Sequence, residues 1–412
     1  MPEFLTLQIP QEAYSLLLQH LPPVQVRRTL VKTRNSINRI TASAILSPED
    51  TPSFHRSTVD GYAVRASDTF GASETLPAFF KVIGEVPMGA MPGFQLHTGE
   101  AALIHTGGAL PEGSNAVVML ENSQLMPPAD LEVYRATGEN ENVVRKGEDL
   151  KVNDVVYPAG VKLGPAQIGG LLALGILQVP VVVSPRVAIL SSGDEVVSPE
   201  KIPLPGQVRD INSYALATLI ESYGGVSTIM GIIPDRPELL EKAVRQGLAE
   251  ADMVVITAGS SASTRDLTSE VINRCGKPGV LVHGINIRPG KPTIMGVCDG
   301  KPVIGLPGNP VSAIVIARMF ITRLVARLSG MTSDLPFAGY LAQLTTNIAS
   351  VAGREDWVPV NLRQESDRLY ADPIFFKSSL IFTLAGADGL AYIPADVTGF
   401  GAGEQVTVIP LY

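Results

Sequence analysis

Hydrophobic and polar residues follow different periods in different parts of the chain. Between residues 186 and 330, short apolar runs alternate with stretches whose apolar residues recur every three or four positions. This alternation of strand and helix predicts a mostly parallel sheet with helices on both faces. Before residue 144, short strands between glycines predict an all-β insertion. Residues 331–412 show no clear helical pattern and predict a small β domain.

Local patterns predict individual elements. Helices are expected over residues 11–20, 27–46, 213–223 and 267–275, behind Asp235–Glu238, and from Pro310 to Leu328. Caps are expected at Asn212, at the box Asp235–Glu238 and at Asn309-Pro310. Asp299-Gly300 predicts a two-residue hairpin turn.

Composition narrows the class of protein. The 412 residues carry a net charge of −8, which argues against a nucleic-acid surface. An anionic ligand would therefore need a local basic pocket. The chain contains two cysteines, Cys275 and Cys298, too few for a disulfide framework, and no signal peptide or membrane span is read. We therefore expect a cytoplasmic protein without nucleic-acid or membrane partners.

The stretch from Asp252 to Ser312 carries the strongest functional signal. The apolar run Met253–Ile256 breaks into a turn of small residues ahead of a helix. A buried strand that enters such a turn is how α/β folds build anion sites. The turns Arg288–Pro292 and Gly305–Pro310 follow, and the basic residues of the first could complete the site. The pattern predicts a site for a phosphate or another oxyanion.

Acidic residues near the predicted strand ends are candidates for catalysis or metal binding. Glu195 and Asp266 follow predicted strands at the same sheet edge, and Asp60 and Asp149 lie on loops of the insertion or its border. Mg²⁺ prefers a few carboxylates together with phosphate oxygens. Glu195 has no evident local partner, whereas Asp266 could equally be a helix cap and Asp60 a turn residue. Asp235 is explained locally as a cap.

Several motifs together resemble one family. They are Val59–Ala63, Thr106–Gly113, Arg145–Asp149, Ser192–Glu195, Pro289–Pro292 and Gly305–Ser312. In this order they resemble the molybdopterin molybdenumtransferases of the bacterial MoeA type, which are similar to the E domain of gephyrin. The motifs span nearly the whole chain, and their combination is far more specific than any one of them.

The resemblance implies a multidomain α/β plus β fold. An α/β molybdopterin-binding domain would occupy residues 181–330, and a C-terminal β-barrel domain residues 331–412. A β insertion domain, 47–144, would interrupt a discontinuous first domain formed by 1–46 and 145–180. The resemblance also implies a homodimer whose cleft is built from both subunits, with Asp60 and Thr106 supplied by the partner.

The activity that the resemblance implies is Mg²⁺-dependent insertion of molybdate into adenylylated molybdopterin, with release of AMP. The implied catalytic residues are Asp60, Thr106, Glu195 and Asp266, and the candidate metal ligands are Asp266, Glu195 and Asp149. Substrate and molybdate binding is expected from Ser260, Ser261, Arg288, Lys291, Pro307, Asn309, Pro310, Ser312, Arg354 and Ser379. A molybdopterin adenylyltransferase is a possible partner.

The chain departs from the family pattern in one loop. Ala258 and Ser263 replace two glycines, and only glycine visits positive φ freely, so we expect a different loop shape. Arg288 replaces the usual lysine and brings a planar fork of donors. A preference for tungstate is one possible outcome. A non-catalytic molybdopterin carrier or scaffold dimer, and a hydrolase of the CinA group sharing only the α/β domain, are the alternatives.

Overall fold

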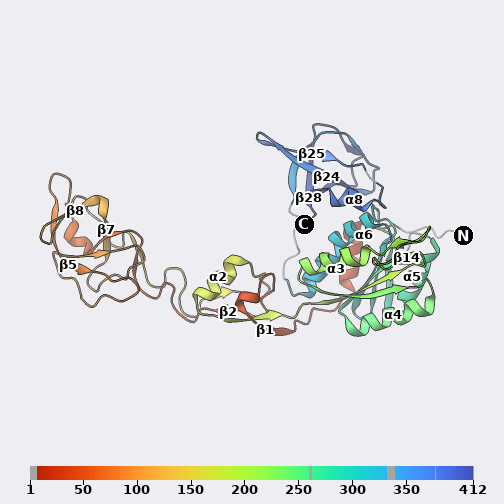
Figure 1. Cartoon of the computed structure of the whole chain (residues 1–412), viewed down its shortest axis with the longest axis horizontal. Helices are drawn as coiled ribbons and strands as arrows, with labels where there is room; N and C mark the ends of the chain where they lie inside the picture. Colours follow the sequence, from red (N-terminus) through yellow and green to blue (C-terminus); the bar gives the residue numbers. More distant parts are fainter. Residues whose placement is uncertain (1–6, 259–261, 332–338, 376, 412) are drawn as a thin grey trace.

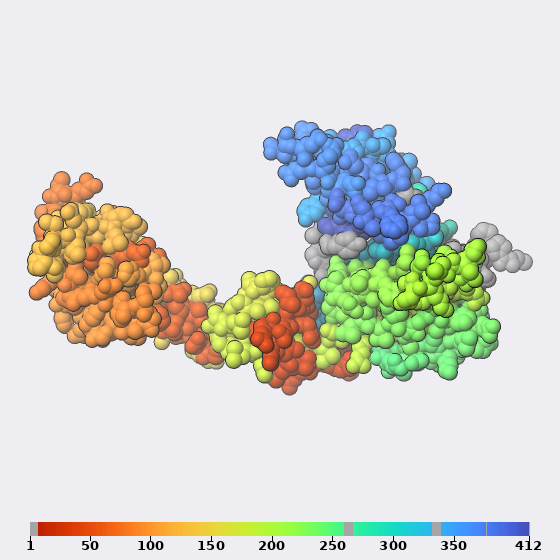
Figure 2. All heavy atoms as spheres, in the orientation of Figure 1, coloured from red at the N-terminus to blue at the C-terminus, as the bar shows by residue number. Residues whose placement is uncertain are grey.

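The structure is a computed structural model that describes residues 7–258, 262–331, 339–375 and 377–411. The chain is elongated (Figure 1): a β unit at one end is joined through a slim middle part to an α/β unit, against which a C-terminal β unit packs. The space-filling view shows how little material the middle part contains (Figure 2). Among the helices of the described residues, none is both long and apolar enough to span a membrane.

The α/β unit is built on a six-stranded sheet with the order β16-β13-β17-β21-β20-β18. The strands are β13 (Arg186–Ser192), β16 (Val226–Ile233), β17 (Met253–Ala258), β18 (Pro278–His283), β20 (Ile294–Cys298) and β21 (Lys301–Pro307). The first four in the order are parallel, and the last two join antiparallel. Asp299 and Gly300 have φ angles of 49° and 83° in the β20–β21 turn, which confirms the predicted hairpin.

Alternate strand residues enter two separate cores. Val187 and Ile189 of β13 face one core, whereas Ala188 and Leu190 face the other. The helices of the first core are α1 (Pro10–Gln19), α3 (Asn212–Ser222), α6 (Pro310–Ile316), a π-helical segment (Ala317–Ile321) and α7 (Thr322–Leu328). The second core is covered by α4 (Pro237–Glu250) and α5 (Ala262–Cys275). Helices therefore cover both faces of a mostly parallel sheet, as the sequence predicted.

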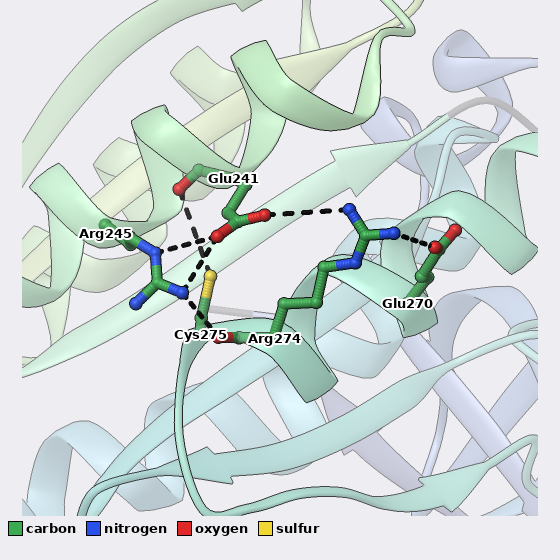
Figure 3. A network of polar contacts seen from close by, with 5 residues as sticks. All are labelled: Glu241, Arg245, Glu270, Arg274 and Cys275. Atoms are coloured by element: carbon green, nitrogen blue, oxygen red, sulfur yellow. Dashed lines mark hydrogen bonds and ion pairs between the residues drawn. The ribbon is translucent and has the colours of Figure 1, made fainter.

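A polar network fastens α4 to α5 on the outside of the second core (Figure 3). Arg245 of α4 donates to Glu241 at 2.8 and 2.9 Å and to the carbonyl of Arg274 at 2.5 Å. Arg274 in turn lies 3.8 Å from Glu241 and pairs with Glu270. Exposed ion pairs contribute little individually, so the apolar core beneath them carries most of the stability. The network fixes the far end of α5, the helix that begins beside the candidate site.

The end unit is a six-stranded sheet with the order β7-β4-β6-β5-β9-β8. Its strands are β4 (Gly61–Val64), β5 (Ala78–Glu85), β6 (Glu100–Ile104), β7 (Ala116–Met119), β8 (Ser123–Met126) and β9 (Asp130–Val133). Apolar residues fill both faces, with Tyr62 and Val64 on one and Ala63 on the other. The expected all-β insertion is confirmed.

The middle part corrects one sequence prediction. Instead of a helix over 27–46, the chain forms β1 (Arg28–Lys32), a 3-10 turn (Thr33–Asn35) and β2 (Ile45–Leu46). β1 pairs antiparallel with β12 (Gln178–Val182), and β2 with β11 (Val155–Tyr157), beside the Pro-started helix α2 (Pro165–Ala173). Asn38 also has a φ of 61°, a left-handed conformation that breaks a helix.

The C-terminal unit is a closed barrel of five strands. β24 (Glu355–Glu365), β25 (Arg368–Pro373), β22 (Tyr340–Leu344), β28 (Gln405–Pro410) and β26 (Gly389–Ile393) pair in this order, and β26 returns to β24. The short strand β19 (Ile287–Arg288) of the preceding unit adds to β24. The expected β domain also holds one short helix, α8 (Ile381–Ala385), which the sequence did not suggest.

The helices with predicted caps form, but the side-chain caps predicted at their N-termini do not. Asp210, not Asn212, accepts a hydrogen bond from the first turn of α3, at 3.1 Å from the Ser213 nitrogen. Asp235 makes no capping box, because its carboxylate instead accepts the Ser192 hydroxyl at 2.7 Å. Asn309 occupies the N-cap position of α6 without a side-chain cap bond. At α3 a nearby side chain, and at Asp235 a tertiary partner, replaces the local bond that the sequence suggested.

Candidate active site

A cavity of about 530 Å³ lies at the carboxyl ends of the parallel strands. Its walls include the ends of β13 and β17 and the turn after β21: Ser191, Ser192, Thr257, Ala258, Gly308, Asn309 and Pro310. This edge is where open α/β sheets bind ligands, because the chain reverses there and exposes backbone donors. The anion site predicted from the 252–312 stretch therefore coincides with a real cavity.

One wall of this sheet-edge cavity carries carboxylates. Glu195, exposed on the rim, follows β13 and lines the cavity together with the buried Asp210. Among the side chains that the structure describes, none forms a hydrogen bond or ion pair with the Glu195 carboxylate, so no protein group competes with a ligand for it. Asp210 is already committed to the α3 cap.

Asn212 joins two walls of the same cavity. Its amide nitrogen donates to the carbonyl of Gly308 at 2.8 Å, which ties the start of α3 to the turn after β21. The side chain is 8% exposed, so the bond is shielded from water and holds the turn firmly.

A second cavity, of about 490 Å³, lies between the α/β unit and the barrel. Four basic side chains line it: Arg288, Lys291, Arg354 and Lys377. Pro307, Asn309 and the buried Ser312 complete the wall on the α/β side. A concentration of cations around a hydroxyl and backbone groups is suited to an oxyanion. We call this the basic cavity.

The two cavities meet at Asn309, which lines both. Pro307 and Ser312 belong to the basic cavity, and Pro310 belongs to the sheet-edge cavity. Ser379 does not join the expected molybdate ligands, because it lines the sheet-edge cavity while its neighbour Ser378 lines the basic one. The backbone of Ser378 accepts a hydrogen bond from Val311 at 3.1 Å, which seats this segment against α6.

Asp60 and Thr106 lie together in the end unit, far along the chain's long axis from the two cavities (Figure 1). The Asp60 carboxylate accepts the Thr106 backbone N–H at 2.8 Å and its hydroxyl at 3.2 Å. His105 lies 3.6 Å from Asp60 and 3.1 Å from Glu85. The Thr106 N–H, with further help from the Thr106 hydroxyl and His105, lowers the pKa of Asp60 below its ordinary value. The carboxylate is thus kept ionised.

The remaining predicted residues are not all brought to one place. Asp149 lies beside Thr51 at the border of the insertion, so one chain does not bring it to Glu195. No cluster of three or more ligating side chains occurs among the residues that the structure describes. Asp266 is not an N-cap, because α5 begins four positions earlier, at Ala262. Ser260 and Ser261 lie outside the described residues.

Sequence reasoning missed two residues that line these cavities and one that lies behind the basic cavity. Lys377 lines the basic cavity from a loop whose sequence has no motif. Asp210 was overlooked because the neighbouring Asn212 looked like the better cap. Asp356, buried behind Arg354, sits in an apolar strand pattern where an acidic residue is itself a signal, since buried charges need partners.

These features define a class of protein: a multidomain α/β protein with a cavity at its sheet edge, a second cavity lined by basic side chains and a β-barrel beside it. Three family profiles match in sequence. The MoeA N-terminal region (domains I and II) matches residues 9–175, the probable molybdopterin binding domain residues 188–327, and the MoeA C-terminal region (domain IV) residues 342–411.

Full-length relatives agree. The chain is 38% identical to a protein of Methanocaldococcus jannaschii named for molybdopterin biosynthesis, over 90% of this chain and 89% of that one. It is 32% identical to the molybdopterin molybdenumtransferase of Haemophilus influenzae, over 97% of both chains. The solved molybdopterin biosynthesis MoeA protein of Pyrococcus horikoshii OT3 is 30% identical, with a TM-score of 0.85 over 98% of this chain and 100% of that one. The chain belongs to the MoeA family of molybdopterin molybdenumtransferases.

Proposed function

We propose that this protein inserts molybdate into adenylylated molybdopterin and releases AMP. The observation that carries the proposal is the pair of adjoining cavities that share Asn309. A phosphorylated pterin suits the cavity at the sheet edge, and a tetrahedral oxyanion suits the basic cavity next to it. Ligands bound in the two cavities would lie next to each other, as a transfer between them requires.

In the basic cavity, Arg288, Lys291 and Arg354 hold the oxyanion, and Ser312 donates its hydroxyl. Positive charge fixed in advance stabilises an anion without reorganisation when it arrives. In the sheet-edge cavity, the hydroxyl of Ser191 and the turn at Gly308 and Asn309 hold the pterin phosphate. Pro307 and Pro310 stiffen that turn on either side. Ser260, Ser261 and Ser379 remain proposed contacts of the same substrate.

Mg²⁺ fits the acidic side of the sheet-edge cavity. Glu195 offers a carboxylate without a protein partner at the cavity rim, and Mg²⁺ prefers such oxygens together with phosphate oxygens. Glu195 and Asp266 would hold the ion, with Asp149 as a weaker candidate supplied from elsewhere. When bound, Mg²⁺ neutralises negative charge on the phosphoanhydride.

We propose a homodimer in which Asp60 and Thr106 serve the partner's cavities. Asp60 is held ionised by Thr106, as a residue that positions a water or accepts a proton must be, yet it lies in the end unit, away from the two cavities described above. The slim middle part also exposes large apolar side chains: Leu30, Leu46, Val155 and Leu177 are 50–69% exposed. Such residues are typical of a surface that a second chain covers.

We propose the domain division 1–46 with 145–180, 47–144, 181–330 and 331–412. Hydrogen-bonded pairing supports it, because the large sheets stay almost wholly within these segments. β19 is the exception, since it leaves the α/β unit to join the barrel. Two buried free thiols, Cys275 and Cys298, support a reducing cytoplasm. A molybdopterin adenylyltransferase is the proposed partner, because it would supply the adenylylated substrate.

The test is AMP release from adenylylated molybdopterin with Mg²⁺ and either molybdate or tungstate. We expect AMP with molybdate, and a tungstate arm that is faster would assign the enzyme to tungsten. Glu195→Gln should abolish most of the release, whereas Glu200→Gln, in the same loop but outside the cavity, should not. Absence of AMP with both anions would refute the transferase and favour a carrier or scaffold.

A further inference from the structure

A buried carboxylate stands behind the basic cavity. Asp356, the second residue of β24, has a side chain that is 2% exposed. It accepts hydrogen bonds from Arg354 Nε at 2.6 Å and Arg354 Nη2 at 2.9 Å, and Arg288 Nη1 lies 3.8 Å away. We infer that Asp356 is a positioning residue that aims the guanidinium of Arg354, and secondarily that of Arg288, at the oxyanion. The inference rests on the proposed function.

The fold places Asp356 between the two arginines. β19 pairs in parallel with β24, so that Arg288 lies opposite Asp356 and Ile287 opposite Glu355. The Glu355 nitrogen donates to the carbonyl of Asn286 at 3.1 Å, and the Asn286 amide donates to the carbonyl of Gly353. This short ladder joins the α/β unit to the barrel, and one arginine comes from each side of the junction.

The hydrogen bonds to Asp356 determine which N–H donors of Arg354 remain free for a ligand. Its guanidinium carries five N–H donors in a planar fork. Asp356 takes the Nε donor and one Nη2 donor, which leaves both Nη1 donors and the second Nη2 donor for a ligand. A bidentate pair fixes the plane of the fork as well as its position. The free edge is therefore aimed before the oxyanion binds.

Charge gives Asp356 a second effect. Arg288, Lys291, Arg354 and Lys377 line one small cavity and repel one another. A carboxylate within reach of two of them offsets part of this repulsion and lets the cations stay close together. Arg354 itself is only 26% exposed, so its charge depends on this partner more than that of the half-exposed Arg288 does.

The experiment measures AMP release as molybdate and adenylylated molybdopterin are varied in turn. Asp356→Asn keeps the shape but loses the charge and one acceptor of the fork. We expect the KM for molybdate to rise about tenfold, since a hydrogen bond to a charged group contributes on that scale. The KM for the adenylylated pterin should stay unchanged. In an Arg354→Ala background, Asp356→Asn should raise the molybdate KM far less than it does alone, because only its contact with Arg288 is then lost.

The matched control is Asp372→Asn. Asp372 also accepts an arginine of the same barrel, Arg363, at 3.3 Å, but it lies outside the basic cavity. The Asp372→Asn variant should leave both KM values unchanged. If Asp356→Asn does not fold, Asp356→Glu keeps the charge and displaces the carboxylate by one methylene, and it should raise the molybdate KM alone.

Three results distinguish a failure of the inference about Asp356 from a failure of the proposed function. An unchanged molybdate KM in an active, folded Asp356 variant overturns the inference and leaves the proposed function intact. An equal rise of both KM values, or an undiminished rise of the molybdate KM in the Arg354→Ala background, also overturns it, because a merely structural residue would act in this way. A wild-type chain that releases no AMP refutes the proposed function, and the role of Asp356 falls with it.

Discussion

Gly290 is the position at which the basic cavity tolerates a side chain least. Its φ is +116°, and a Cβ added there would come within 2.4 Å of Cδ1 and 2.5 Å of Cγ1 of the buried Ile316 on α6. Thr293 also donates to the Gly290 carbonyl from its hydroxyl at 2.7 Å, so the turn is not free to rotate away. Gly290→Ala must therefore strain the backbone or displace α6.

The magnitude follows from the two contributions. The unfavourable φ costs about 1–2 kcal/mol for a residue with a side chain, and overpacking a core contact costs about 1–3 kcal/mol. We expect Gly290→Ala to lower the free energy of unfolding by about 3 kcal/mol. At ~2–4 °C per kcal/mol for a cooperative unit of this size, the melting temperature should fall by about 6–12 °C. The molybdate KM should also rise, because Lys291 is the next residue.

Calorimetry of four variants separates the backbone cost from the cost of the steric contact with Ile316. Gly231→Ala is the matched control: Gly231 has a φ of +101° and no described heavy atom within 4 Å of an added Cβ, so it should show the φ cost alone. Ile316→Ala by itself should cost about 2–5 kcal/mol. In the double variant the methyl contact disappears, and the combined loss should be about 1–3 kcal/mol less than the sum. Strict additivity, or equal losses in Gly290→Ala and Gly231→Ala, would refute the steric explanation.

Two further predictions concern the end unit. Mixed dimers of Asp60→Ala and Glu195→Ala chains should recover part of the AMP release that each variant lacks alone, and verified heterodimers without any recovery would contradict a shared site. The Asp60 carboxyl should titrate below its ordinary pKa in carboxyl NMR, because the Thr106 N–H stabilises the ionised form. A pKa that is lower in the folded state than in the unfolded state stabilises the fold at pH values above the unfolded pKa. This stabilisation is lost as the pH falls through the folded pKa. Thr106→Ala keeps the N–H and should keep most of the shift, so a return to the ordinary pKa would show that the hydroxyl is the main cause.

The sequence predicted the α/β sheet well because its signals are local and repeated. Apolar runs such as Met253–Ile256 can only be buried strands between helical periods, and Asp299-Gly300 supplies the two positive φ angles that a tight hairpin needs. The prediction failed where long-range pairing overrides local composition. Arg28–Lys32 became a strand because Gln178–Val182, far along the chain, pairs with it.

In the candidate site, too, sequence reasoning works where topology fixes a position and fails where side-chain direction decides it. Strand ends and Pro-Gly turns pointed to residues that line the two cavities, since the carboxyl edge of a parallel sheet is fixed by topology. Which member of a pair of adjacent residues faces a cavity is decided by side-chain direction, and sequence cannot supply that for a loop. Ser378 and Ser379 show this, because they line different cavities although they are neighbours. Asp356 required knowledge of how β19 joins β24.

The overall negative charge does not conflict with an oxyanion site. The net charge of −8 is spread over an elongated chain of 412 residues, and exposed charges beyond about 8 Å are largely screened at physiological ionic strength. The potential in the basic cavity is therefore set by the groups that line it. Four cations there outweigh the single buried carboxylate of Asp356, and local arrangement overrides composition.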